Sequence, residues 1–600
     1  MKTTLAKYRY LLVTYFKPLW RLALGLGIVL LSNISLRLIN PTLISSFIDA
    51  VVGGKPASEL VKDALLFLGT AILIQLLALG ETYLAANMGL LATNRLRADL
   101  ALHCMKLDLS FHNQHTPGEM IERVDGDVGT LENFFSRFIL EVLGSIILMV
   151  GILIILFRID WRVGAVFCLF ILISLAILSK IRDVAVPSYR KARQVNAELF
   201  GFLEERLSGT EDVRANGAVA YVMRGLYEYS RPVLRTWVKA QFTGGLAYSA
   251  IVILFIAGSA IALALGAYLF KSGAITIGTV YLIFRYAELL NLPLENINRQ
   301  FYELQQAGAS SIRIMDLLAL KSVVLNTGEV ELPPRQAFSV ECKRVSFKYQ
   351  DDVDRPKNKP EETVPVKTEL EKVLNDISFK LPAGVILGLL GRTGSGKTTL
   401  IRLLARFYDP LQGSIQLNGV SLPEIELGQL RQRIGLVTQE IQLFSASLRE
   451  NLTLFDLQIP DERILHAFAE LGLEDWYHSL PEGLDTKMEP GGGGLSAGEA
   501  QLLAFVRVFL RDPGLIILDE ASSRLDPATE ARLDHAIERL LYGRTAIIIA
   551  HRLGTVQRAE RILILENGWQ VEYGERQALA DDPASHFARL LRTGLQEALA

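Results

Sequence analysis

Long uncharged apolar runs fill the first half of this 600-residue chain and constrain its fold more than any other feature. A helix needs about 20 apolar residues to cross the hydrocarbon layer of a membrane. The composition agrees, because 50% of the residues are hydrophobic and only 21% are charged. We expect six membrane-spanning helices, at approximately 20–45, 62–90, 136–158, 161–181, 243–269 and 276–298.

The connections between these runs predict their orientation. The third and fourth runs are joined by a tight turn near Arg158 and Asp160, and the fifth and sixth by LFKSGAIT. Lys and Arg concentrate instead in the N-terminal tail and in the long connections 91–135 and 182–242, which places these segments in the cytoplasm. The first run lacks a small-residue cleavage site, so we expect it to be retained as a span.

The two long connections keep apolar residues at helical spacing with charges between them, so we expect the spans to continue as helices into the cytoplasm. Turn formers interrupt this pattern at 111–119 (FHNQHTPGE) and at 207–217 (LSGTEDVRANG). These interruptions predict short exposed elements at the far tips of the two loops.

Several ionisable residues fall inside the expected spans. A charge near the centre of a bilayer costs at least ~2.5–3.5 kcal/mol, so it usually faces a wet cavity or a partner. Two interpretations stay open: a polar pathway for a substrate, strongest at Arg285, or charges near an interface or on cytoplasmic extensions. The residues are Arg37, Glu81, Glu141, Arg285 and Glu288.

From about residue 338 the pattern changes to apolar strands that alternate with helices, which is typical of an α/β domain. The expected fold class is a membrane α-helical domain of six long spans followed by a cytoplasmic α/β ATPase domain. We expect the membrane domain at 1–320, a linker at 321–337 and the ATPase domain at 338–600.

A glycine-rich loop, Gly391-Arg-Thr-Gly-Ser-Gly-Lys-Thr, follows the apolar strand 385–390 and precedes an apolar helix, which is the context of a phosphate-binding loop. Its glycines let backbone N–H groups curl around phosphates at a helix N-terminus. Lys397 can reach the β- and γ-phosphates, and the Thr398 hydroxyl can ligate Mg²⁺. The candidate nucleotide-binding residues here are Gly391, Arg392, Thr393, Gly394, Ser395, Gly396, Lys397, Thr398 and Thr399.

Two further apolar strands end in residues suited to ATP hydrolysis. GLIILDE ends in Asp519, placed to hold the Mg²⁺ shell, and Glu520, placed to deprotonate the attacking water. The strand in AIIIAHR delivers His551, for which we favour a γ-phosphate contact over a structural role. Glu520 and His551 are therefore the catalytic candidates.

These motifs, in this order and spacing, resemble the ABC transporter family over nearly the whole chain. LSAGE, with Ser496, Ala497, Gly498 and Glu499, looks like the family signature, usually LSGGQ. Gln439 resembles the Q-loop residue, which implies an Mg²⁺ contact. Tyr349 resembles the aromatic residue that stacks on adenine, and Asp526 the D-loop. The segments 111–128 and 204–217 resemble the two cytoplasmic coupling loops of the exporter subclass. The resemblance to this family as a whole implies ATP and Mg²⁺ as cofactors.

The resemblance also predicts a partner subunit. The chain carries one ATPase domain, whereas the family sandwiches ATP between the phosphate loop of one domain and the signature of another. In the signature, Ala497 replaces Gly, and its Cβ restricts what we take to be a loop. Glu499 replaces Gln and brings negative charge toward an anionic ligand. We predict a heterodimer whose other half has an intact signature and a degenerate catalytic Glu; a homodimer stays open.

Other classes of function are disfavoured. A net charge of −2 argues against nucleic acid as a partner, and the three cysteines lack metal or disulfide spacing. We expect export of a drug, lipid or peptide across a prokaryotic cytoplasmic membrane. A lipid flippase and an ATP-gated channel or regulator that pumps nothing stay open. The charged segment 350–372 and the run Gly491–Gly494 are expected to be flexible loops.

Overall fold

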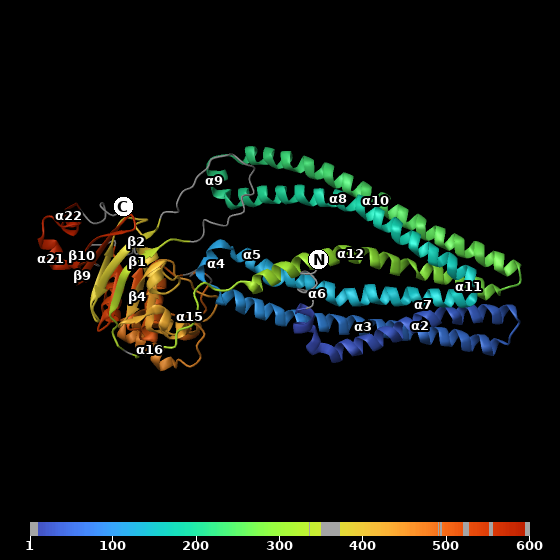
Figure 1. Ribbon diagram of the computed structural model, residues 1–600, viewed down its shortest axis with the longest axis horizontal. Coiled ribbons are helices and arrows are strands. Elements are labelled where there is room, and N and C mark those ends of the chain that lie inside the picture. Colours follow the sequence, from blue (N-terminus) through green and yellow to red (C-terminus); the bar gives the residue numbers. More distant parts are fainter. Residues whose placement is uncertain are drawn as a thin grey trace. The chain divides into compact units, whose positions relative to one another are not determined.

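The computed structural model describes residues 10–334, 336–349, 372–489, 491, 495–519, 527–550 and 556–593. The chain forms two compact units. One comprises Met1–Met105 with Pro117–Leu320, and the other comprises Lys106–Thr116 with Lys321–Ala600. The first unit is helical and the second is built around a β-sheet (Figure 1).

The helical unit is made of long helices joined by short turns. Their bounds are η1 Leu12–Phe16, η2 Lys17–Leu19, α2 Trp20–Val52, α3 Ala57–Lys106, α5 Pro117–Ile121, η3 Glu122–Gly126, α6 Asp127–Phe138, η4 Ile139–Leu143, α7 Gly144–Ile159, α8 Trp161–Ser208, α9 Thr210–Ala215, α10 Val219–Lys271, α11 Ile277–Leu289 and α12 Asn291–Ala319.

Three of these helices are far longer than a bilayer requires. Helices α3, α8 and α10 have 50, 48 and 53 residues. At 1.5 Å per residue each extends about 70–80 Å, more than twice the hydrocarbon thickness of about 30 Å. The prediction that spans continue as helices beyond the membrane is therefore confirmed. The predicted interruption at 207–217 is also present, because the short helix α9 separates α8 from α10 there.

The sixth expected span, 276–298, is not a single helix. Five helical segments in the described part of the chain are long and apolar enough to cross a membrane, and this segment is not among them. Helix α11 has 13 residues and ends at Leu289, and α12 begins at Asn291. Pro293 explains the break, because proline has no N–H to donate to the carbonyl of Leu289.

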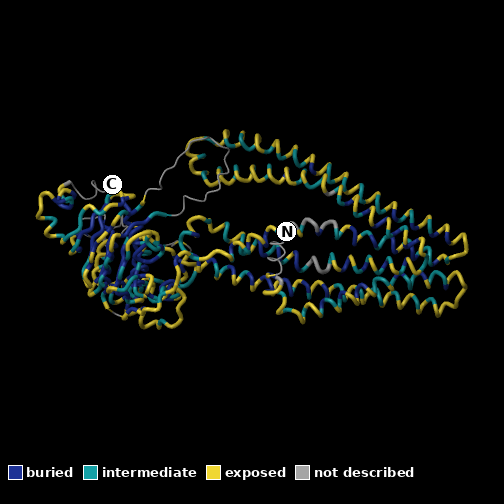
Figure 2. Tube along the Cα trace, viewed as in Figure 1, coloured by how far each residue is buried: buried dark blue, intermediate teal, exposed yellow. Residues whose placement is uncertain are grey.

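The helical unit buries a core of aliphatic and aromatic side chains and leaves apolar side chains exposed outside it. Phe167, Ile283 and Leu294 are fully buried in this core. Exposed residues run along much of α8 and α10, which lie side by side (Figure 2). These include large apolar side chains such as Leu172 and Ile253. Apolar outer faces are what lipid-contacting spans require.

A ten-stranded sheet organises the second unit, in the order β5-β4-β1-β2-β10-β9-β3-β8-β7-β6. Strands β9, β3, β8, β7 and β6 pair in parallel, whereas β1, β2, β4 and β5 form an antiparallel part. The strands are β1 Val340–Phe347, β2 Leu374–Leu381, β3 Ile386–Leu390, β4 Gln412–Leu417, β5 Val420–Ser421, β6 Ile434–Val437, β7 Leu515–Asp519, β8 Thr545–Ile549, β9 Arg561–Glu566 and β10 Trp569–Glu575.

The parallel strands are buried on both faces, which explains their continuous apolar sequences. In β7, Leu515 and Ile517 enter one hydrophobic cluster, whereas Ile516 and Leu518 enter another. Helices cover both sides. They are α4 Leu109–Gln114, α13 Lys397–Leu404, η5 Leu422–Glu424, α14 Leu427–Arg433, α15 Leu448–Thr453, α16 Asp461–Glu470, α17 Glu474–His478, η6 Gly483–Asp485, α18 Ala497–Arg511, α19 Pro527–Leu541, α21 Arg576–Asp581 and α22 His586–Thr593.

Candidate nucleotide site

The glycine-rich loop between β3 and α13 has a shape that other residues could not adopt. Gly391, Gly394 and Gly396 have φ values of +148°, +83° and +101°, in the region that disfavours side chains. A Cβ on Gly391 would lie 2.2 Å from the carbonyl oxygen of Leu565, and a Cβ on Gly396 would lie 2.6 Å from Cδ2 of Leu374. The loop is therefore a concave turn of bare backbone.

Hydrogen-bond donors line this turn, and some of them have no acceptor within the described protein. The hydroxyl of Ser395 is buried and makes no hydrogen bond. Gly396 precedes α13 without a side-chain cap, so the first N–H groups of the helix are available to an anion. Nζ of Lys397 donates to the carbonyl oxygens of Gly391, at 2.6 Å, and Arg392, at 2.9 Å.

The charge of Lys397 is held where it is poorly solvated. Burial lowers the pKa of the Lys397 ammonium below its ordinary value, and the Asp519 carboxylate acts in the opposite direction. A buried cation, an unbonded hydroxyl and an uncapped helix N-terminus together fit a polyphosphate. The side chain of Thr398, next in the sequence, is exposed at the mouth of the loop.

The sheet gathers other predicted residues at the same edge. Strands β3, β8, β7 and β6 are parallel neighbours, and Asp519 at the end of β7 pairs with Ile549 of β8. Gln439 is exposed two residues beyond the end of β6. Since the carboxyl ends of parallel strands meet at one edge, Asp519 and Gln439 lie on the side of the sheet where the glycine loop begins. Predicted residues Glu520, Asp526 and His551 lie outside the described residues.

Tyr349 lies beside the first turn of α13. Its hydroxyl is 3.0 Å from Oγ1 of Thr399 and accepts a hydrogen bond of 3.3 Å from Arg402. The ring packs edge-on against Phe347 and Tyr408, with centroid distances of 5.0 and 5.3 Å. The structure thus brings this aromatic side chain next to the glycine loop. The following segment, 350–371, lies outside the described residues, as do Gly492–Gly494.

The LSAGE motif starts helix α18 rather than forming a loop. Ser496 is the N-cap and Ala497 is the first helical residue, a position where alanine has no conformational cost. The Ser496 hydroxyl accepts from the backbone N–H of Glu499, and Oε2 of Glu499 accepts from the backbone N–H of Ser496 at 2.7 Å. This is a capping box, so the expected strain at Ala497 is absent.

The carboxylate of Glu499 has a second partner in its own domain. Its Oε1 accepts a hydrogen bond of 2.9 Å from the indole Nε1 of Trp476. Burial acts to raise the pKa of the Glu499 carboxyl, but the hydrogen bonds from Ser496 and Trp476 outweigh it and leave the pKa below its ordinary value. Glu499 is therefore a fixed anion at the start of α18.

Two family models match the chain. Residues 24–294 match the ABC transporter transmembrane region, and residues 374–523 match the ABC transporter model. The fatty acid ABC transporter ATP-binding/permease protein of Mycobacterium bovis is 30% identical over 81% of this chain and 74% of its own length. The chain belongs to the ABC transporter family. It is an integral membrane protein that binds ATP and hydrolyses it to drive transport.

Other relatives align with similar fractions of the length of this ABC transporter. The ABC transporter ATP-binding protein YfiC of Bacillus subtilis is 29% identical over 90% of this chain and 87% of its own. The ATP-dependent lipid A-core flippase of Syntrophus aciditrophicus is 27% identical over 85% and 82%. A bacterial Atm1-family ABC exporter, solved with ATP bound, has the same fold. Its TM-score is 0.76, with 24% identity over 97% of this chain and 98% of that one.

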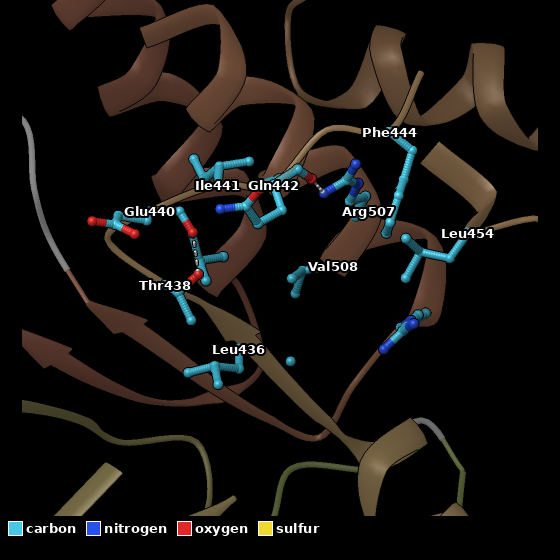
Figure 3. A pocket seen from close by; sticks show the side chains of 13 residues that line it. Leu436, Thr438, Glu440, Ile441, Gln442, Phe444, Leu454, Arg507 and Val508 are labelled. Carbon is cyan, nitrogen blue, oxygen red and sulfur yellow. Dashed lines mark hydrogen bonds between the residues drawn. The ribbon is translucent and has the colours of Figure 1, made fainter. Parts of the chain in front are cut away.

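The ATPase domain of the transporter also contains a groove of about 300 Å³ lined by Thr438 and Glu440, the residues on either side of Gln439 in the sequence (Figure 3). Residues of β6, of the segment after it and of α18 line the groove. Arg507 of α18 donates to the carbonyl oxygen of Gln442 at 2.9 Å, and Oγ1 of Thr438 donates to the carbonyl oxygen of Glu440 at 2.8 Å. The Arg507 bond ties the Gln439 segment to the helix that the signature begins, and the Thr438 bond shapes the segment itself.

Helix α4, from the first long loop, packs within the same unit as the ATPase domain. Nδ2 of Asn113 donates a hydrogen bond of 2.8 Å to the hydroxyl of Tyr408, whose ring contacts Tyr349. Leu109 packs against the apolar cluster of the sheet. Asp108 caps α4 and also accepts from the Ser322 hydroxyl at 3.2 Å. The tip of the first long loop thereby reaches the neighbourhood of the nucleotide site.

Sequence reasoning missed the hydrogen bonds that Glu499 and Asn113 make. The spacing Ser496-x-x-Glu499 is a capping-box pattern and could have indicated that Glu499 bonds its own helix. No local signal points to Trp476 or Asn113, because their partners Glu499 and Tyr408 lie 23 and 295 residues away.

Proposed function

We propose that this chain is one half of a heterodimeric ABC exporter that moves a drug, lipid or peptide out of the cytoplasm. One observation carries the proposal: a chain with membrane-spanning helices also holds a preshaped phosphate cradle at Ser395 and Lys397, while Glu499 of its signature is a fixed anion. The relatives named as fatty acid transporter and lipid A-core flippase support an amphiphilic solute.

Different residues of this chain have different roles at the nucleotide site. Backbone N–H groups of the glycine loop and the Lys397 ammonium hold the phosphates, and Tyr349 contacts the base. Thr398, Asp519 and Gln439 are the oxygen-bearing residues assigned to Mg²⁺. Glu520 accepts a proton from the attacking water and His551 contacts the terminal phosphate. Bound MgATP supplies the phosphoryl group whose hydrolysis resets the transporter.

The altered signature is the basis for proposing two different subunits. The first N–H groups of α18 and its dipole favour an anion, and in this family that anion belongs to ATP held by the opposite subunit. Here Glu499 already places a carboxylate at that end of the helix. A second anion must approach against this charge, so the site completed by LSAGE is weakened. The phosphate loop and Glu520 of this chain would form the hydrolytic site with the signature of the partner.

The groove beside the Gln439 segment is proposed to respond to nucleotide binding. Arg507 and Arg511 of α18 line it. Because Arg507 bonds the Gln439 segment, a shift of that segment on nucleotide binding would alter the groove. In this way closure at the nucleotide site would move the membrane helices and open them outward.

The pairing is tested by comparing the purified chain with the chain co-purified with a second half-transporter. ATP turnover and solute transport should require the second subunit, and that subunit should carry LSGGQ with a replaced catalytic Glu. Robust turnover and transport by the chain alone would favour the homodimer instead. A neighbouring gene with these features would give the candidate partner.

The role of Glu520 is tested by the substitution Glu520→Gln. Loss of the carboxylate removes the proton acceptor and leaves the phosphate cradle intact, so ATP binding should persist while turnover falls by at least ~10²-fold. Turnover at the wild-type rate would remove Glu520 from this role.

An ATP-gated channel or regulator is the alternative from another class. Solute uptake into sealed vesicles with the ATPase domain outside distinguishes an exporter from a channel or regulator, because only a pump accumulates solute against its gradient. We propose that the N-terminus and the ATPase domain lie in the cytoplasm, on the basis of the Lys and Arg distribution. The bacterial relatives support a prokaryotic cytoplasmic membrane.

A further inference from the structure

A small polar cavity lies inside the helical unit, among apolar helices. It has a volume of about 120 Å³ and is bounded by α2, α3, α7 and the junction of α11 and α12. This volume is several times what one water molecule needs, so the cavity admits a few waters or one compact polar group. Its polar lining includes Asn33 and Arg37 from α2 and Glu81 from α3.

Two side chains in this cavity are buried without full hydrogen bonding. Asn33 is 1% exposed and Glu81 is 8% exposed, yet Nδ2 of Asn33 and Oε1 of Glu81 make no hydrogen bond of ordinary geometry, although the Asn33 amide lies near the Glu81 carboxylate. The other amide atom of Asn33, Oδ1, accepts from Nε of Arg37 at 3.1 Å. A buried polar atom without a partner costs roughly 1–3 kcal/mol. These donors and acceptors therefore indicate an occupant.

The break in the expected sixth span adds to the polarity of the cavity. Leu289 and Pro293 both line it, and Pro293 has no N–H to donate to the carbonyl of Leu289. Interrupted helices at membrane depth are tolerated where they border protein or a polar cavity, and they commonly mark binding sites. The break and the buried polar side chains thus coincide in one place.

The depth of the cavity suggests a headgroup. Along α3, Glu81 lies about 36 Å from Ala57, and along α2, Asn33 lies about 28 Å from Val52 at 1.5 Å per residue. Helices α2 and α3 are joined by the short turn between Val52 and Ala57. If this turn lies at one membrane surface, the cavity lies near the opposite edge of a hydrocarbon layer about 30 Å thick.

The charges of the cavity select the kind of headgroup. Arg37 and Glu81 both line the cavity and lie close enough to attract each other, but among the described residues they form no direct ion pair. An anionic ligand would leave Glu81 uncompensated, and a cationic ligand would leave Arg37 uncompensated, both at high cost in low dielectric. A group with one anion and one ammonium compensates both.

We propose that this cavity binds a zwitterionic headgroup, with its anionic oxygen at Arg37 and Asn33 and its ammonium at Glu81. Binding itself is independent of transport. That the ligand is also carried across the membrane rests on the proposed export function.

The test measures lipid retention by the full-length transporter in a non-ionic maltoside detergent, by native mass spectrometry. The protein is titrated with phosphatidylethanolamine, which carries both charges, or with phosphatidylglycerol, which carries only the anion. We expect at least tenfold tighter retention of phosphatidylethanolamine. Arg37→Gln and Glu81→Gln should each weaken it at least tenfold, and Glu81→Gln should remove the preference over phosphatidylglycerol. Lys55→Gln and Glu59→Gln, an exposed ion pair at the start of α3, are the matched controls.

A soluble zwitterion, glycerophosphoethanolamine, separates the two sources of the headgroup. If glycerophosphoethanolamine displaces phosphatidylethanolamine at equal concentration, the site binds soluble zwitterions. If only the lipid binds, the site binds a lipid headgroup. Both results support the site. Equal retention of the two lipids by the wild type, or retention unaffected by Arg37→Gln and Glu81→Gln, would overturn it and leave a water-filled cavity. ATP binding by the same preparations tests the proposed function separately.

Discussion

The indole Nε1 of Trp476 donates a 2.9 Å hydrogen bond to Oε1 of Glu499, across 23 residues of sequence. Trp476 belongs to α17, and Glu499 to the first turn of α18. The bond fixes a carboxylate at the helix end that the family uses to contact ATP of the other subunit. It gives the departure from LSGGQ a structural basis in this chain.

The substitution Glu499→Gln removes this negative charge and keeps the size of the side chain. In the two-subunit complex, we expect it to tighten ATP binding at the site completed by LSAGE by roughly two- to fivefold, because a charge near a helix N-terminus changes the binding free energy by about 0.3–1 kcal/mol. Nucleotide affinity at the two sites, measured by equilibrium binding, checks this. The control is Glu474→Gln, on α17 away from the capping box; weaker binding in Glu499→Gln would contradict the prediction.

The same carboxylate predicts a pH dependence of stability. Its folded-state pKa lies below the ordinary glutamate value of about 4.3, so the ionised form stabilises the fold above that pH. This contribution is lost as the pH falls below about 4.3 and through the lower folded-state pKa. The difference in melting temperature between wild type and Glu499→Gln should therefore be largest at neutral pH and shrink in acid. A difference that grows on acidification would have the wrong sign.

Removing the ammonium of Lys397 should abolish tight nucleotide binding. Lys397→Gln leaves the buried cradle without its cation, and charge-assisted hydrogen bonds contribute about 1.5–3 kcal/mol each. We expect ATP affinity to fall by roughly 100-fold, about 2.7 kcal/mol, in equilibrium binding. Lys487→Gln, an exposed lysine of the same domain, is the control and should bind ATP normally. Retained affinity in Lys397→Gln would place the phosphates elsewhere.

The bond between Asn113 and Tyr408 should link α4 to the nucleotide site. A double-mutant cycle of Asn113→Ala, Tyr408→Phe and the double variant isolates it, and we expect a coupling free energy of about 0.5–1.5 kcal/mol in thermal unfolding. Stimulation of ATP turnover by transported solute should fall in each single variant, with no further loss in the double variant. Strictly additive effects would show that the two residues act independently.

Much of the architecture could be predicted because its signals are local in the sequence. Apolar runs of sufficient length predicted five helices that can span a membrane, whereas the sixth expected run is divided between α11 and α12. The amphipathic continuations predicted the long helices α3, α8 and α10. The loop from Gly391 to Thr398 was recognisable because glycine spacing, Lys397 and the flanking apolar segments all lie within one short stretch. Parallel strands then place Asp519 and Gln439 at one edge of the sheet.

The sequence by itself determined the five long apolar helices and the glycine loop that we propose binds phosphates, since helix length and loop chemistry depend on neighbouring residues. Tertiary structure alone decided that Glu499 meets Trp476, that Asn113 meets Tyr408 and that Asn33, Arg37 and Glu81 share a cavity. The physical reason is that these contacts depend on how helices rotate and pack, and a sequence does not specify rotation until the elements are assembled.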